Sequence, residues 1–150
     1  MKALLQRVSE ASVEVEGKEV GRIGKGLLVL LGVVNGDTSE DVEYLGAKIP
    51  NLRIFGDGRG KMNLSVREVG GGILVVSQFT LAADCRKGNR PSFDNAGAPD
   101  LAEKFYLDLI GRLSSGGGPV EAGRFGAAMK VRLVNDGPVT ILLDSRREKP

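Results

Sequence analysis

Two continuous apolar runs mark parts of this chain as buried strands. One covers residues 26–34, and the other covers residues 73–76, directly after the three glycines at 70–72. A short apolar run bounded by turn residues is typical of a strand that is buried on both faces. The second run leads straight into the polar segment at residues 77–80. A polar cluster at the end of such a rigid strand is expected where the core meets a surface, where a fold usually presents its chemistry.

Two other stretches carry apolar residues at helical spacing. Residues 38–41 form a capping box in which Asp41 replaces the commoner Glu, and an apolar face follows at Val42, Leu45 and Ile49. The second stretch begins near Pro99, and its apolar stripe consists of Leu101, Phe105, Leu109 and Leu113, widened by Ile110. These patterns predict two amphipathic helices.

The remaining segments indicate further strands joined by short turns. Alternating valines predict a hairpin over residues 2–20, and shorter strands are expected at 52–55, 120–123, 129–134 and 139–144. Strands outnumber helices, and most connections are hairpin-like. The sequence therefore predicts one α+β domain over residues 1–150, with a curved, mostly antiparallel sheet, a barrel-like core and two helices.

Composition narrows the possible chemistry. The 150 residues fit one domain, and the single cysteine rules out an internal disulfide, as is usual in a reducing cytosol. The absence of histidine excludes Ser-His-Asp and Cys-His catalysis and makes a metal site unexpected. The net charge of +2 is too small to indicate nucleic-acid binding by itself. No secretory or membrane-spanning run is present, so we expect a cytoplasmic protein.

Several polar segments are open to two interpretations each. Ser77 and Thr80 either form a site or merely end the strand by bonding to nearby backbone. Three cations at residues 86–90 belong either to a solvated loop or to a surface that meets a phosphate backbone. The glycines at 56–60 are best explained by a turn, since no helix or Walker lysine follows them.

Residues 135–138, Asn-Asp-Gly-Pro, lie between two expected strands. Turn chemistry alone accounts for them, because Asn, Asp and Gly tolerate left-handed angles and Pro fixes its own φ. The alternative is a cis bond between Gly137 and Pro138, which is a minority state for X–Pro bonds. Such a bond would turn two carbonyls the same way and make a rigid wall that discriminates by shape.

Taken together, the residues after the buried strand and those at the second turn resemble the D-aminoacyl-tRNA deacylase family. The two segments are 77–81, Ser-Gln-Phe-Thr-Leu, and 135–140, Asn-Asp-Gly-Pro-Val-Thr. Further similar segments occur in the same order at 6–8, 60–65, 90–93 and 123–129. The resemblance covers essentially the whole chain, with no departure at the signature positions.

This resemblance implies an editing hydrolase that cleaves D-aminoacyl-tRNA, or glycyl-tRNA, at the ester to the terminal adenosine. It implies a homodimer in which Gly137 and Pro138 of each subunit enter the partner's pocket and exclude L side chains, while Arg7 holds them in place. No cofactor or metal is expected. The residues implied to line the site are Ser77, Gln78, Phe79, Thr80, Phe125 and Met129, with Phe79 and Thr80 as the catalytic pair.

Two mechanisms are compatible with a chain that lacks histidine. The Thr80 hydroxyl could attack as a nucleophile, although an unassisted threonine is weak. Alternatively, the 2′-hydroxyl of the adenosine helps to activate water, and the backbone amides of Phe79 and Thr80 hold the oxyanion. The missing base favours the second mechanism. Two other classes of function stay open: a non-catalytic RNA-binding module and a purely structural domain. The chain has few aromatic residues, which gives the RNA-binding module little support.

Overall fold

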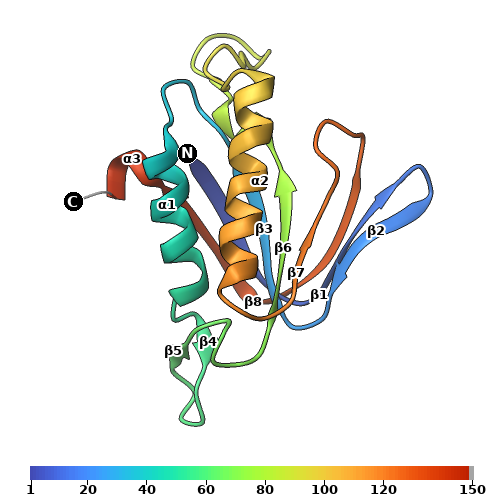
Figure 1. The fold of residues 1–150 in the computed structure, drawn as a ribbon, viewed down its shortest axis with the longest axis vertical. Helices are drawn as coiled ribbons and strands as arrows, with labels where there is room; N and C mark the ends of the chain where they lie inside the picture. Colours follow the sequence, from blue (N-terminus) through green and yellow to red (C-terminus); the bar gives the residue numbers. More distant parts are fainter. Residues whose placement is uncertain (149–150) are drawn as a thin grey trace.

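The long first strand organises the sheet. One edge of β1 (Lys2–Val15) pairs antiparallel with β3 (Gly26–Gly32) and then with β2 (Lys18–Ile23), so the predicted hairpin is confirmed. The other edge pairs antiparallel with β8 (Lys130–Asp144). The computed structural model describes residues 1–148, and the last two residues of the expected domain lie outside this part. Figure 1 shows β1 crossing behind the helices and joining these neighbours.

The two apolar runs form the centre of the sheet, as predicted. β3 pairs parallel with β6 (Gly72–Ser77), which in turn pairs parallel with β7 (Val120–Ala122). Every residue from Gly72 to Val76 is buried. The sheet is therefore mixed, with its antiparallel part around β1. β2 also contacts β6 and β7, so the sheet curls towards closure in a barrel-like form.

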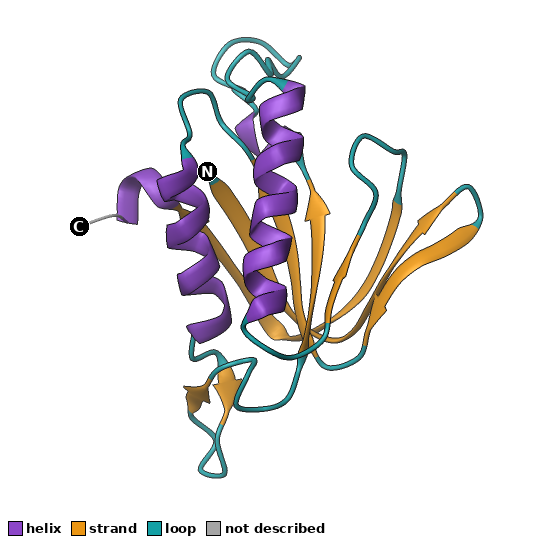
Figure 2. Ribbon diagram, viewed as in Figure 1, coloured by secondary structure: helices purple, strands orange, loops and turns teal. Residues whose placement is uncertain are grey.

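Two helices cover one face of this sheet and complete the predicted α+β domain (Figure 2). α1 (Ser39–Lys48) begins where the Thr38 N–H donates to the Asp41 carboxylate at 2.8 Å, as the capping box requires. α2 (Pro99–Ser115) buries Phe105, Leu109 and Leu113. Leu101 was expected in the same stripe, but 40% of it is exposed. In the first turn of α2, Ala102 faces inward instead of Leu101, as the helical period of 3.6 residues allows.

The short elements differ most from the sequence prediction. The strand expected at 52–55 is wrong in its bounds, because only the last of these residues enters a two-residue strand. The remaining elements of the described chain are η1 (Ile49–Asn51), β4 (Phe55–Gly56), β5 (Met62–Leu64), η2 (Phe79–Ala82) and α3 (Ser145–Glu148). No helix in residues 1–148 is long and apolar enough to cross a membrane.

The segment around residues 135–138 does not separate two strands. It is a bulge within the single strand β8, which stays paired to β1 on both sides of it. Gln6 faces Thr140 and Val8 faces Asn135, so two steps along β1 correspond to five along β8. The extra residues must leave the ladder, because the partner strand offers them no positions. The expectation of a turn between separate strands was therefore wrong.

Candidate functional site

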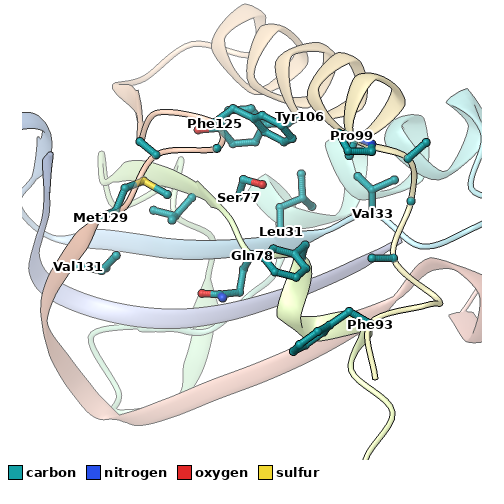
Figure 3. Close-up of a pocket in the computed structure, with 18 residues that line it drawn as sticks. Leu31, Val33, Ser77, Gln78, Phe93, Pro99, Tyr106, Phe125, Met129 and Val131 are labelled. Atoms are coloured by element: carbon teal, nitrogen blue, oxygen red, sulfur yellow. The ribbon is translucent and has the colours of Figure 1, made fainter. Parts of the chain in front are cut away.

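A cavity of about 660 Å³ opens where β3 and β6 end beneath the first turns of α2 (Figure 3). Its walls come from these strands, from the start of α2 with the segment before it, and from the segment between β7 and β8. Its lining residues are Leu31, Val33, Val76, Ser77, Gln78, Phe79, Phe93, Ala96, Gly97, Ala98, Pro99, Ala102, Tyr106, Phe125, Gly126, Ala127, Met129 and Val131. An apolar cavity with a few polar groups is typical of a small-molecule or catalytic site.

The polar strand end lies at the mouth of this cavity. Ser77 and Gln78 line it, and β6 ends there because the chain tightens into η2. Thr80 is not a lining residue, but its hydroxyl accepts a hydrogen bond from the Gln78 side chain. The first N–H groups of a short helix have no partner inside that helix. The backbone of Phe79 and Thr80 therefore begins η2 in a position suited to donating to a bound ligand.

Phe125 and Met129 reach the cavity from a loop that leaves β7. The Gly123 N–H donates to the Val75 carbonyl at 2.9 Å and fixes the start of this loop against β6. A Cβ added at Gly123 would lie 2.7 Å from the Met129 sulfur, so a larger residue there would require the Met129 side chain to shift. The Phe125 ring packs 5.8 Å from the ring of Tyr106. Figure 3 shows Phe125 and Tyr106 side by side above Ser77.

Tyr106 is a cavity residue that the sequence patterns did not single out. Its hydroxyl lies 3.1 Å from the Val75 carbonyl oxygen and 3.0 Å from that of Gly123. Burial raises the pKa of Tyr106 to about 12, so the phenol stays protonated near neutral pH. Among the described residues that line the cavity, Tyr106 is the only titratable one. Its helical spacing from Leu109 and Leu113 was a signal, but it is the spacing of any core residue.

The second group of predicted site residues lies elsewhere. Arg7 Nε donates to the Asp136 carbonyl and its Nη1 donates to the Ile54 carbonyl, both at 2.7 Å. The Asn135 amide closes the base of the bulge, because its Oδ1 accepts from the Val139 N–H at 2.9 Å. The Gly137–Pro138 bond is cis, and both residues are exposed. The roles that the family resemblance implies for Arg7, Gly137 and Pro138 stay predictions.

The structure thus gathers some of the predicted site residues and separates others. Five of them line one cavity: Ser77, Gln78, Phe79, Phe125 and Met129. Arg7, Gly137 and Pro138 do not line the cavity of their own chain. Within the described residues, no group of three or more Cys, Asp or Glu side chains could hold a metal ion.

Comparison with solved structures supports the fold assignment. A structure titled c-Myc DNA Unwinding Element Binding Protein aligns with a TM-score of 0.91 and 45% identity, covering 96% of this chain and 98% of that chain. A structure titled as an analysis of a probable eukaryotic D-amino acid tRNA deacylase aligns with a TM-score of 0.78 over 95% of this chain and 97% of that chain. At 20% identity, the second shows a shared fold.

Sequence comparison gives the class of the protein. The family model described as D-Tyr-tRNA(Tyr) deacylase matches residues 4–144. The D-aminoacyl-tRNA deacylase of Syntrophobacter fumaroxidans is 60% identical over 98% of this chain and 99% of its own length. That of Thermosipho africanus is 56% identical over the same shares.

By these matches the protein is an ester hydrolase of the tRNA-editing class. The chain belongs to the D-Tyr-tRNA(Tyr) deacylase family, as the resemblance of residues 77–81 and 135–140 predicted.

Proposed function

We propose that this protein hydrolyses the ester between a D-amino acid, or glycine, and the terminal adenosine of tRNA in the cytoplasm, and rejects L-aminoacyl-tRNA. The observation that carries the proposal is the cavity at the end of β6, which is apolar and opens beside the polar residues 77–80. An aminoacyl ester is already activated, so positioning and backbone donors are enough to cleave it. Membership of the deacylase family supports this choice of substrate.

In this mechanism the ester carbonyl lies at the start of η2. Water attacks the carbonyl carbon, the carbonyl electrons move onto the oxygen, and the N–H groups of Phe79 and Thr80 hold the resulting oxyanion. The 2′-hydroxyl of the adenosine accepts the proton from the attacking water and passes its own proton to the 3′-oxygen. As the electrons of the oxyanion re-form the carbonyl, the bond between the carbonyl carbon and the 3′-oxygen breaks, which gives the free amino acid and a 3′-hydroxyl on the tRNA. Ser77 and Gln78 bind the adenosine side, and Phe125 and Met129 face it across the cavity.

The alternative uses Thr80 as a nucleophile and passes through a covalent ester. A nucleophilic hydroxyl needs a base to remove its proton. The Thr80 hydroxyl accepts a hydrogen bond from the side chain of Gln78, an amide without basic character. This arrangement favours water activated by the substrate over attack by the side chain.

The selection against L side chains is assigned to the bulge of a second subunit. Gly137 and Pro138 are exposed and lie outside their own cavity, and the carbonyl of the preceding Asp136 accepts a hydrogen bond from Arg7. β8 pairs with no described strand other than β1, and its Val134 and Leu142 side chains are 50% and 54% exposed. An unpaired edge with exposed apolar residues is suited to association. A homodimer would bring the bulge of one chain to the cavity of the other.

The test is deacylation of matched D-tyrosyl-, L-tyrosyl- and glycyl-tRNA, with and without EDTA. We expect hydrolysis of the D and glycyl esters, little action on the L ester, and full activity in the chelator. Equal rates on the D and L esters would refute selection by the bulge. Binding of all three tRNAs without turnover would identify an RNA-binding module instead.

Sedimentation of the purified protein tests the shared site separately. We expect a dimer at micromolar concentration, since each cavity would need the partner's bulge. A stable monomer with full D selectivity would contradict this arrangement.

A further inference from the structure

A loop rich in cations connects the polar strand end to α2. It covers residues 84–95 and contains Arg86, Lys87 and Arg90, all exposed. We call this segment the basic loop. It follows η2 and precedes the first turn of α2, at the upper end of that helix in Figure 1.

Hydrogen bonds hold the basic loop in a defined conformation. Asp84 and Ser92 pair across its base through two backbone hydrogen bonds of 2.8 and 2.9 Å. The Asp84 carboxylate also accepts from the Arg86 backbone at 3.0 Å and from its guanidinium. The Asn35 N–H donates to the Asn95 carbonyl at 3.0 Å and anchors the far end. The tip turns at Gly88, whose φ of 65° suits glycine.

The charges of the basic loop are only partly neutralised within the protein. The pairing with Arg86 holds the pKa of Asp84 low, at about 2, so this pair is fully ionised and balanced at neutral pH. Lys87 and Arg90 have no acidic partner among the described residues. Asp94 is the nearby counter-charge, and its carboxylate accepts from the Ser92 hydroxyl at 2.8 Å. Two exposed cations are therefore available to an anionic ligand.

The basic loop is continuous with the wall of the cavity. Phe93 lines the cavity and packs edge-on against Phe79, with ring centroids 5.2 Å apart. Both rings are partly exposed, by 37% and 56%. On its other side the loop borders an open depression of about 890 Å³, to which Lys2, Arg86 and Arg147 contribute. An exposed aromatic edge next to free cations is the usual surface for single-stranded nucleic acid.

We propose that the basic loop binds the sugar–phosphate backbone of the tRNA nucleotides that precede the terminal adenosine, with Lys87 and Arg90 contacting phosphates. This inference rests on the proposed function. A cavity of about 660 Å³ holds a ligand of the size of one aminoacylated nucleoside. The rest of the RNA must then cross the rim of the cavity, and the phosphates that cross beside Phe93 meet the basic loop. Contacts of this kind supply affinity without reading the base sequence.

The experiment compares two substrates that differ only in the presence of these phosphates. D-tyrosyl-tRNA carries them, whereas D-tyrosyl-adenosine ends at the nucleoside. The test variant is Lys87→Ala with Arg90→Ala. The control variant is Lys18→Ala with Lys48→Ala, which removes the same charge from exposed positions near the β1–β2 turn and the end of α1.

We expect the test variant to raise KM for D-tyrosyl-tRNA by about tenfold, as the loss of two phosphate contacts predicts. The dependence of log KM on log salt should become shallower by about 1.4, roughly 0.7 for each lost contact with a single strand. Hydrolysis of D-tyrosyl-adenosine should not change. The control variant should behave as the wild type on both substrates.

Two results would overturn the proposal. One is an unchanged KM and salt dependence for D-tyrosyl-tRNA. The other is an equal loss on both substrates, which would mean that the basic loop only supports the cavity wall. If the wild type hydrolyses neither substrate, the proposed function is wrong. Equilibrium binding of uncharged tRNA by the same two variants then still decides the role of the basic loop: tenfold weaker binding by the test variant supports it, and equal binding refutes it.

Discussion

The cavity beside α2 is walled by side chains, whereas the bulge of β8 presents backbone. Phe125, Tyr106 and Met129 enclose the cavity and pack against the ends of the central strands. The bulge exposes Gly137 and Pro138 and is held in place by hydrogen bonds to its carbonyls and amides. The cavity is lined by residues of one chain, and the bulge of that chain lines no part of it.

This difference supports the separate tasks that we propose for the two regions. Side-chain walls can adapt to a ligand through rotamer changes, which suits a site that positions an adenosine and an ester. A surface of glycine and proline backbone has no side chain that can move aside, which suits rejection by shape. Each task can therefore be removed without the other, and four experiments follow in order of expected effect.

The largest effect should come from the substrate rather than from the protein. Replacing the terminal adenosine of D-tyrosyl-tRNA by 2′-deoxyadenosine removes the group that we assign to proton transfer. A positioned proton acceptor contributes roughly 10²–10⁴-fold. We expect single-turnover deacylation to slow by about 10²-fold or more. Normal turnover of the deoxy substrate would mean that the cavity holds a base of its own.

Gly137→Ala should separate selection from catalysis. The added Cβ would clash with the Val139 backbone nitrogen and lie 2.8 Å from its Cγ2, so the bulge must shift. We expect the ratio of D to L deacylation to fall by about tenfold or more, because a displacement of about 1 Å is enough to disturb a site. Gly58→Ala is the control, since its Cβ would meet nothing within 4 Å. Unaltered selectivity in Gly137→Ala would remove the bulge from the mechanism.

Thr80→Ala tests the side chain at the start of η2. The backbone amide remains in this variant, so the oxyanion donors are kept. We expect less than about a tenfold loss, whereas a lost oxyanion donor costs roughly 10²–10³-fold. The measurement is single-turnover deacylation of D-tyrosyl-tRNA, with folding checked by circular dichroism. A folded but inactive variant would establish Thr80 as the nucleophile.

The smallest expected effect is on the stability of the fold, through Tyr106 in the cavity wall, and it appears only at alkaline pH. The pKa of Tyr106 is raised to about 12 by burial, above an unfolded value of about 10. The unfolded chain therefore loses this proton first, and the stability that the buried phenol contributes is complete below about pH 10 and declines as pH rises towards 12. Urea unfolding at about pH 9 and 11 should show a smaller decline in Tyr106→Phe than in the wild type. Equal declines would mean that Tyr106 ionises freely in the folded state.

The sequence by itself determined the central strands, both helices and the family. Continuous apolar runs have few alternatives to a doubly buried strand, and the capping box at Thr38 specifies a helix start through bonds between residues three positions apart. The local pattern failed at Leu101, where the helical face turned towards Ala102. It also missed Tyr106, because a buried tyrosine has the same spacing as any core residue.

Only the tertiary structure decided how the candidate residues are grouped. From the sequence, Arg7 is indistinguishable from any solvated charge on a strand. The pairing of β1 with β8 places it opposite the bulge, where it bonds to the Asp136 carbonyl. The sequence of residues 135–138 is typical of a turn between strands. The structure shows that the same β1–β8 pairing continues on both sides of them. Local turn chemistry depends on neighbouring residues, whereas strand register depends on a partner more than a hundred residues away. The physical reason is that hydrogen bonds between distant strands, absent from any local pattern, fix which residues meet.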